Sequence, residues 1–378
     1  MTHFESYFKS SYSEAQAEFL ERCKKLKEKF PFSKEYSIHL EAIDRDIPIF
    51  VLKKTEKQST KLILVSSGVH GVEGYYGSAM QSLVMDEYLS GKISVQSDTM
   101  FIHAINPFGF ENGRRVNENN IDLNRNFFFK REKIHKKEKN KGYKKLSSFF
   151  MPKFPFTFWG IEYLIFSLRF GGILFRYGVR KFTDALVNGQ FQYKKGIYYG
   201  GKKPEPVVKK LKNFFLTHIA DYSKIILFDL HTGHGEKNKL VLIQNSLPGS
   251  LEDQNIASIV SGLPLLRPDS STSFYRTAGD FTDYLERIFP GHNGLFPLTV
   301  EMGTLGNLDF WGALRGTFLM IAENRIYHRG SWFQSSRNKV NQKFLQYFYP
   351  KDRQWMRSAY LRTKVTIKTL IQRFENLN

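Results

Sequence analysis

Cysteine is almost absent from the sequence, with Cys23 the only one in 378 residues. An intrachain disulfide is therefore impossible, and a metal site cannot be built from several thiolates. Any transition-metal site in this chain must use histidine and carboxylate ligands. Residues Met1–Phe8 also lack the basic head and apolar core of a secretory signal, so we expect a cytoplasmic protein.

Internal repeats and low-complexity linkers are missing too, as are a helix-turn-helix signature, a zinc-finger spacing and an aromatic single-strand-binding motif. The composition is that of a globular protein, with 41% hydrophobic and 24% charged residues. The net charge of +20 nevertheless requires an account. Nucleic acid, anionic lipid or an acidic substrate would each be attracted to it, and a basic surface without a particular partner is the simpler explanation.

Short apolar segments of strand length alternate with helical stretches along the chain. An amphipathic helix is expected at Ser13–Phe30, and the turn Gly68–Gly77 leads from a strand into a helix that reaches Tyr88. Apolar strands separated by helices predict an α/β fold with a mostly parallel, mixed central sheet flanked by helices. The expected strands are Tyr36–Ala42, Ile47–Leu52, Lys61–Ser66, Thr99–Ile105, Lys224–Leu230, Lys239–Gln244 and Pro297–Met302.

One elaborated domain with an N-terminal extension is expected. Residues 1–55 supply a helix and strands that pack on a catalytic domain spanning 56–378. That domain carries a basic and aromatic insertion at 128–190 and ends in a basic part with a helical pattern, Asn338–Phe374.

The insertion begins with the basic run Lys130–Lys145 and continues with the apolar, aromatic segment Phe154–Phe175. This segment has the length of a membrane span, but Glu162 and Arg169 interrupt it. We expect a helical insertion that is buried or lies at an interface. Peripheral contact with a membrane surface is the alternative.

Two histidines follow apolar strands, where ligands gather in parallel sheets. His70 and Glu73 lie three residues apart in a glycine-rich turn, which lets both side chains face one point. His231 ends the strand FDLH and leads into another glycine turn, with His234 as a weaker substitute. Two imidazoles and one carboxylate are a ligand set of catalytic zinc, so we predict one zinc ion.

Further polar residues follow the other strands. Glu301 ends the apolar strand PLTVE, where a carboxylate is costly unless it is hydrogen-bonded or functional, so we expect it to transfer protons. The segment Asn106–Phe127 contains arginines and Asn124. Guanidinium groups bind carboxylates in a bidentate manner and stabilise an oxyanion.

These elements occur in the order that the zinc carboxypeptidase (carboxypeptidase A-like) family uses, and the chain resembles that family from Lys61 to Gly330 with large insertions. The segments GQFQYKKGIYYGG and VEMGTLG look like a bacterial subgroup of it. The resemblance implies a metallopeptidase that removes residues next to a free carboxylate. The matching positions are His70, Glu73 and His231 for the zinc ligands, Glu301 for the general base, Arg115 for the oxyanion-stabilising arginine, Asn124 and Arg125 for binding the terminal carboxylate, and Tyr275 for the mobile tyrosine that caps the substrate.

Several alternatives stay open. Arg114 could serve in place of Arg115, and Thr282 at the side-chain-selecting position indicates neither a basic nor an acidic pocket. The succinylglutamate desuccinylase and aspartoacylase branch shares the same core, so an N-acyl amino acid deacylase is the rival enzyme. The rival outside enzymology is a basic module that binds nucleic acid or a membrane surface without catalysis.

Overall fold

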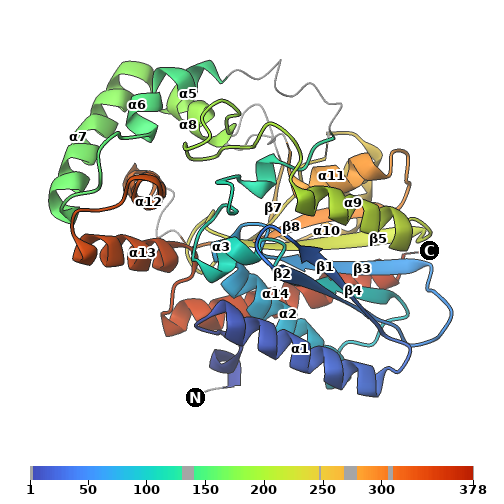
Figure 1. The fold of residues 1–378 in the computed structure, drawn as a ribbon. Helices are drawn as coiled ribbons and strands as arrows, with labels where there is room; N and C mark the ends of the chain where they lie inside the picture. The colour runs from blue at the N-terminus through green and yellow to red at the C-terminus, as the bar shows by residue number, and fades with distance from the viewer. Residues whose placement is uncertain (1–2, 130–139, 247, 268–278, 305–309, 378) are drawn as a thin grey trace.

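A mixed eight-stranded sheet forms the centre of the computed structural model, which describes residues 3–129, 140–246, 248–267, 279–304 and 310–377 (Figure 1). The strand order is β1-β2-β4-β3-β5-β8-β6-β7. Strands β4, β3, β5 and β8 are parallel neighbours, and β6 and β7 are parallel to each other. The pairs β1–β2, β2–β4 and β6–β8 are antiparallel. The strands are β1 Lys34–Leu40, β2 Arg45–Leu52, β3 Lys61–Ser67, β4 Asp98–Ile102, β5 Lys224–Thr232, β6 Leu240–Ile243, β7 Leu265–Leu266 and β8 Leu295–Met302.

Helices cover both faces of this sheet, which explains why its central strands are apolar along their whole length. On one face α1 (Tyr12–Lys29), α2 (Gly74–Leu89) and α14 (Arg353–Glu375) share a core with the sheet. On the other face α9 (Pro206–His218) and α11 (Phe281–Ile288) do the same. The predicted α/β fold with a mixed, largely parallel sheet is confirmed. The remaining elements near the sheet are η1 His3–Tyr7, η2 Gly71–Glu73, α3 Pro107–Glu111, η3 Leu123–Arg125 and α10 Leu251–Val260.

A separate apolar cluster lies beyond the end of the sheet, where the basic and aromatic insertion was expected. Aromatic side chains of the insertion, such as Phe150 and Phe166, pack there against Phe318 and Val340 of the C-terminal helices. No helix among the described residues is long and apolar enough to cross a membrane. The elements are α5 Lys141–Lys145, α6 Ser147–Phe150, α7 Trp159–Tyr177, α8 Val179–Val187, α12 Phe310–Arg329 and α13 Gln334–Phe348.

Some element ends differ from the prediction, each for a local reason. The first strand ends at Leu40 instead of Ala42, because the chain turns through Asp44 with a left-handed φ of 49°. Strand β4 ends at Ile102, because Ala104 is also left-handed, with φ of 58°. The C-terminal segment expected at 338–374 contains two helices, because Pro350 interrupts the first.

Candidate active site

A tight turn after β3 carries the first two predicted ligands. Gly68 takes a left-handed φ of 68°, which an L side chain rarely adopts, and so turns the chain out of the strand. The backbone N–H of Gly71 then donates to the carbonyl of Arg115 at 3.1 Å, and that of Val72 donates to the carbonyl of Arg114 at 2.8 Å. These bonds fix the turn of His70 and Glu73 against the segment that carries the two arginines.

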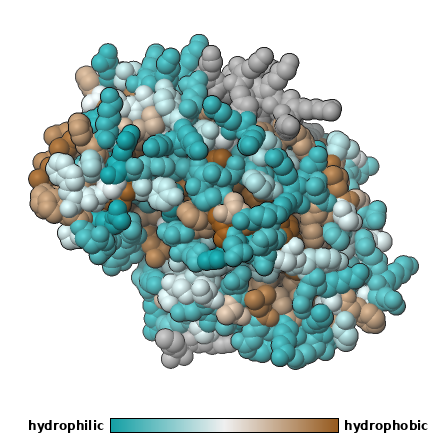
Figure 2. Space-filling view, viewed as in Figure 1, coloured by the Kyte–Doolittle hydropathy of each residue, from teal (hydrophilic) through white to brown (hydrophobic). Residues whose placement is uncertain are grey.

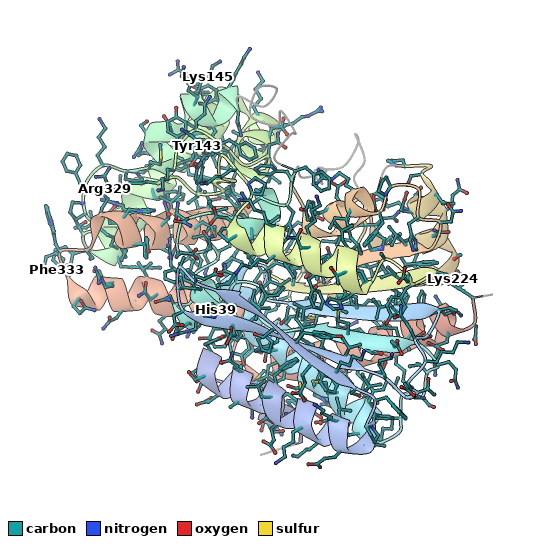
Figure 3. The ribbon with its side chains drawn as sticks, turned by 45° about the vertical axis from the view of Figure 1, so that its right-hand side comes forward. His39, Tyr143, Lys145, Lys224, Arg329 and Phe333 are labelled. Carbon is teal, nitrogen blue, oxygen red and sulfur yellow. The ribbon has the colours of Figure 1, made fainter. Side chains whose placement is uncertain are left out.

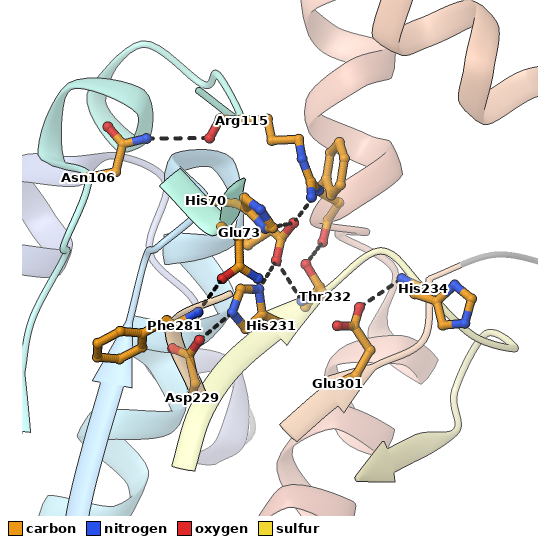
Figure 4. Close-up of polar contacts among 12 residues, drawn as sticks. His70, Glu73, Asn106, Arg115, Asp229, His231, Thr232, His234, Phe281 and Glu301 are labelled. Carbon is orange, nitrogen blue, oxygen red and sulfur yellow. Dashed lines mark hydrogen bonds and ion pairs between the residues drawn. The ribbon is translucent and has the colours of Figure 1, made fainter. Parts of the chain in front are cut away.

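The three predicted metal ligands converge at the carboxyl ends of β3 and β5 (Figure 4). His70 Nδ1 lies 2.9 Å from Glu73 Oε1, and His231 Nδ1 lies 2.8 Å from Glu73 Oε2. All three side chains are buried, and one potential ligand atom from each lies within 4.8 Å of the others. Within the described part of the chain, they form the group whose spacing could hold a metal ion.

Two aspartates orient the imidazole rings. His70 Nε2 lies 3.1 Å from Asp122 Oδ1, and His231 Nε2 lies 2.6 Å from Asp229 Oδ2. Asp229 and His231 are two apart on β5, so their side chains share one face of the sheet. Ser66 holds the other oxygen of Asp229 with a hydroxyl hydrogen bond of 2.7 Å. In both histidines the outer nitrogen is thus engaged by a carboxylate, and Nδ1 faces the shared centre.

The donor set fits a zinc ion. His70 Nδ1 is buried and has no hydrogen-bond partner within the described parts of the chain, because its 2.9 Å approach to Glu73 does not have hydrogen-bond geometry. A buried nitrogen left in this way is a metal-ligand candidate, since unpaired buried polar groups are costly. Two imidazoles whose second nitrogens contact carboxylates, together with one glutamate, are a catalytic zinc set with its usual outer partners.

The electrostatics of the cluster favour positive charge at its centre. Burial alone would raise the pKa of Glu73, but His70 and His231 outweigh it, and the pKa lies well below the usual value. Burial alone would lower the pKa of His231, but Asp229 and Glu73 raise it well above its usual range. The surrounding carboxylates therefore stabilise a cation in this buried place.

Glu301 lies beside His231 on the adjacent strand, as its register partner in the parallel pair of β8 and β5. Its carboxylate is buried, and Oε1 accepts a hydrogen bond of 2.7 Å from the backbone N–H of His234. Burial, together with the nearby charge of Glu73, raises the pKa of Glu301 to about 8. Such a carboxyl group exchanges protons near neutral pH, which suits a general base and acid.

The neighbouring arginines point to different places. Arg115 donates from Nη1 to Glu73 Oε1 at 3.0 Å and from Nε to Asp122 Oδ2 at 3.2 Å, so its guanidinium lies beside the metal ligands. Arg114 donates to Glu323 Oε1 at 2.6 Å and stacks on the ring of Tyr327 at 3.4 Å. Of the two, only Arg115 contacts the candidate site.

Asn124 and Arg125 lie next to the site but are engaged in local contacts. Asn124 Oδ1 accepts the backbone N–H of Phe281, the first residue of α11, at 3.0 Å. The Nη atoms of Arg125 donate to the carbonyls of Asn124 at 3.0 Å and of Val187 at 3.1 Å. The Nε atom of Arg125 is buried and has no hydrogen-bond partner among the residues that the structure describes.

Of three other predicted positions, one lies outside the described residues and two are not members of the metal group. Tyr275 lies outside the described residues. Thr282 is buried at the start of α11, where its hydroxyl donates to Asp280. His234 contacts Glu301 through its backbone N–H and is not a member of the group His70, Glu73 and His231.

Four residues near the centre were not singled out from the sequence. Asp122 and Asp229 stand in the quoted motifs, and the two-residue spacing of Asp229 and His231 on a strand was the signal that placed them on one face. Tyr198 has a left-handed φ of 55°, and its ring centre lies 5.5 Å from Arg115 Cζ and 5.8 Å from Arg125 Cζ. Tyr198 lies in the quoted segment GQFQYKKGIYYGG, but no pattern singled out this residue or Tyr347. The hydroxyl groups of both tyrosines share the electrostatic environment of Arg115.

A family profile decides where the chain belongs. Residues 8–362 match the family described as "Protein of unknown function (DUF2817)". The chain belongs to this family. A search of curated proteins finds no match to this DUF2817 chain.

Solved structures similar to the DUF2817 chain include three that span most of it. Bovine thrombin-activatable fibrinolysis inhibitor, in complex with tick carboxypeptidase inhibitor, is 16% identical, with 85% of this chain and 98% of that one covered and a TM-score of 0.47. Carboxypeptidase A from Helicoverpa armigera is 16% identical, and the match covers 91% of this chain and 75% of that one with a TM-score of 0.47. A metallo-carboxypeptidase from Burkholderia cenocepacia is 12% identical, and the match covers 96% of this chain and 71% of that one with a TM-score of 0.46. Two of the three carry the name of the family that the sequence resembles, but the function of this chain has to come from its own residues.

Proposed function

We propose that this DUF2817 chain is a zinc-dependent hydrolase that cleaves a peptide or amide bond next to a free carboxylate. The observation that carries the proposal is the convergence of His70 Nδ1, His231 Nδ1 and the Glu73 carboxylate, with Glu301 beside them on the next strand. Structural carboxylates seldom need such an arrangement, whereas metal-assisted hydrolysis uses both a metal and a proton acceptor.

His70, Glu73 and His231 would hold the zinc ion through two nitrogens and one carboxylate. When bound, zinc supplies Lewis acidity, which makes water nucleophilic near neutral pH and polarises a carbonyl group. Asp122 and Asp229 keep the two imidazole rings oriented, and such outer carboxylates strengthen metal binding.

Glu301 would take the proton from the attacking water and return it to the departing nitrogen. Its carboxyl pKa of about 8 lets the group exist in both protonation states at neutral pH. The hydrogen bond from the His234 backbone fixes Oε1, so the other oxygen is the one that exchanges the proton.

Arg115 would stabilise the negative charge that develops on the carbonyl oxygen, because its guanidinium lies beside Glu73. Asn124 and Arg125 would bind the carboxylate of the substrate through N–H groups not used in their backbone contacts. The capping role of Tyr275 belongs to the same proposal.

Replacement of Glu301 tests the proposal. Glu301→Gln keeps the size of the side chain but removes the proton acceptor, so turnover should fall by about 10²–10⁴-fold while zinc content stays at that of the wild type. Glu87→Gln is the matched control, since Glu87 is a buried carboxylate on α2 that pairs with Lys364 instead. Wild-type turnover by Glu301→Gln would overturn the role of Glu301.

Metal content tests the centre itself. Purified protein should contain zinc in the wild type and lose it in His231→Ala, whereas His292→Ala, whose ring contacts the carbonyl of Tyr222 far from the centre, should retain it. Equal zinc content in both variants would place the metal elsewhere.

Substrate class separates the peptidase from its rival. Peptides with a free C-terminus and N-acyl amino acids both present an amide next to a carboxylate, so they are assayed side by side at equal enzyme concentration. Hydrolysis confined to the acyl amino acids would favour an N-acyl amino acid deacylase over a carboxypeptidase. Activity in both cases depends on Glu301.

We place this activity in the cytoplasm, a proposal supported by the single, buried Cys23.

A further inference from the structure

Helix α7 has an apolar outer face. Phe166 and Phe170 point inward and are buried in the cluster with α12. A surface helix normally presents charged and polar residues on the side opposite to its buried stripe. Here the opposite side is apolar and exposed, at Ile161, Leu164, Ile165, Leu168 and Phe175.

The apolar surface continues beyond both ends of the helix. At its start, Phe158 stacks on Phe333 with ring centres 3.9 Å apart, next to the exposed Trp332. Beyond its end, Val179 is exposed, and on α12 the exposed Phe310 contacts the inward-facing Phe170 with ring centres 5.6 Å apart. We call this surface the α7 face; it comprises the five residues above with Phe154, Phe158, Val179, Phe310, Trp311 and Trp332.

Exposure of this size and kind is unusual for a surface that faces water. Phe175 is 96% exposed and Leu168 is 70% exposed, and both project from a helix that is well packed on its other side. Figure 2 shows hydrophobic side chains gathered at the edge of the molecule where α7 lies in Figure 1. Contiguous apolar patches mark a binding surface for a protein or a membrane.

Positive charge surrounds the α7 face. Arg169 and Arg176 are seven residues apart on α7, so they line one edge of the apolar stripe. Between residues 141 and 190 the acidic residues are Glu162, which pairs with Arg325 at 2.7 Å, and Asp184. The basic residues of this stretch are Lys141, Lys144, Lys145, Lys153, Arg169, Arg176, Arg180 and Lys181.

The basic side chains lie at the same end of the molecule as the α7 face. Figure 3 places Lys145, Arg329 and Phe333 at the end that carries the insertion, whereas Lys224 lies at the other end of the molecule. Lys145 and Arg329 are exposed. Apolar side chains and cations thus share one end of the protein.

We propose that the α7 face docks on the surface of an anionic lipid membrane. An amphipathic helix that lies in the interface buries its apolar residues among the acyl chains, while flanking Lys and Arg contact acidic headgroups. Tryptophan and other aromatic residues, such as Trp332 and Trp311, are favoured at that depth. The charge argues against a second copy of the chain as the occupant, because two such faces would bring their arginines together without acidic partners.

Binding to vesicles tests the proposal in the full-length protein. Sedimentation with vesicles of phosphatidylcholine containing phosphatidylserine should carry the wild type down, and vesicles of phosphatidylcholine alone should bind it much less. Leu164→Glu combined with Leu168→Glu should weaken binding to the mixed vesicles by about tenfold or more, because two acidic groups replace apolar contacts. Added salt should weaken the binding of the wild type.

A matched control is available on α14. Leu361→Glu combined with Val365→Glu makes the same change at two exposed helical positions four residues apart, outside the α7 face, and should leave vesicle binding unchanged. Circular dichroism and hydrolase turnover in solution should be equal for both variants.

Three results would overturn membrane docking. One is sedimentation that does not depend on phosphatidylserine, and another is equal loss of binding in the α7 and α14 variants. The third is a wild type that does not bind vesicles but forms a dimer, measured by light scattering without lipid. Leu164→Glu with Leu168→Glu would dissociate that dimer. That last result would assign the α7 face to self-association. Loss of hydrolase activity in Glu301→Gln has no bearing on any of these outcomes.

Discussion

Neighbouring residues with the same chemistry acquire different roles through what their side chains contact. Arg114 and Arg115 are both buried or nearly so, yet Arg114 pairs with Glu323 while Arg115 pairs with Glu73 and Asp122. The η2 turn holds the backbone carbonyls of both arginines through the N–H groups of Gly71 and Val72, while the two side chains take different partners.

This difference predicts a split between activity and stability. Arg115→Lys keeps the charge but loses the planar fork beside Glu73, so kcat/KM should fall by about 10²–10³-fold. Arg114→Lys should keep kcat/KM within a few-fold but lower the free energy of unfolding by about 1–3 kcal/mol, because its hydrogen bonds to Glu323 and Asn120 and its stacking on Tyr327 are lost. Steady-state kinetics and urea denaturation on the same preparations measure both. The reverse pattern would transfer the catalytic role to Arg114.

The sequence was most informative where side chains follow apolar strands. His70, His231 and Glu301 come together because β3, β5 and β8 are adjacent and parallel, so their carboxyl ends meet. Tyr198 could not be found in this way, since it lies in a loop whose path is set by tertiary contacts and not by periodicity. The sequence favoured Arg115 over Arg114 but left both open, because adjacent residues in a loop carry no periodicity that shows which side chain contacts Glu73.

At the scale of elements, the turn between β3 and α2 depends on close backbone packing. A Cβ atom on Gly71 would lie 2.1 Å from the carbonyl carbon of Gly109 in α3, and backbone atoms cannot move aside as a flexible side chain would. This contact explains how α3 supports the His70–Glu73 turn, although α2 and β4 separate the two segments in the sequence.

Gly71→Ala is therefore expected to be destabilising and to weaken the metal centre. The unfolding free energy should drop by about 1–3 kcal/mol from overpacking, and zinc content should fall as the turn shifts. Gly160→Ala is the control, because a Cβ there has no atom within 4 Å, and its effect should be neutral or slightly stabilising in a helix. Urea denaturation and metal analysis give the two readouts. Equal stability of Gly71→Ala and the wild type would show that the turn can move away from α3.

Element type was easier to predict than element ends. The expected apolar strands and the first helix are present within three residues of their expected ends, because burial of whole strands and helical periodicity are strong local signals. The split of the C-terminal helix at Pro350 was readable from the proline but was not predicted. The outward orientation of the apolar residues of α7 could not be read, since periodicity shows that a helix has two apolar sides but not which one finds a partner.

At the scale of the whole molecule, one buried histidine links global stability to pH. His103 has no exposed surface, stacks on Phe19 with ring centres 4.5 Å apart and contacts Gln81 Oε1 through Nδ1 at 3.1 Å. Gln81 donates both amide hydrogens to the carbonyls of Val65 and Ile102, so its oxygen accepts and His103 Nδ1 carries the proton of the neutral ring. Protonation would place a second N–H on Nε2, which is buried without a partner.

Burial lowers the pKa of His103 from 6.5 to about 3. Between these values the unfolded chain binds a proton at this position and the folded chain does not, so the free energy of unfolding falls as pH falls. One proton contributes a slope of about 1.4 kcal/mol per pH unit in that window. His103→Phe removes the titration and retains an aromatic ring against Phe19. From pH 6 to pH 4.5 the free energy of unfolding of the wild type should therefore fall relative to that of the variant, with this slope. Urea denaturation at several pH values in the presence of a chelator measures it, because metal binding would add its own pH dependence. Parallel pH profiles of the two proteins would mean that the native fold admits the charged ring, and hence that the core between α1 and the sheet opens to water.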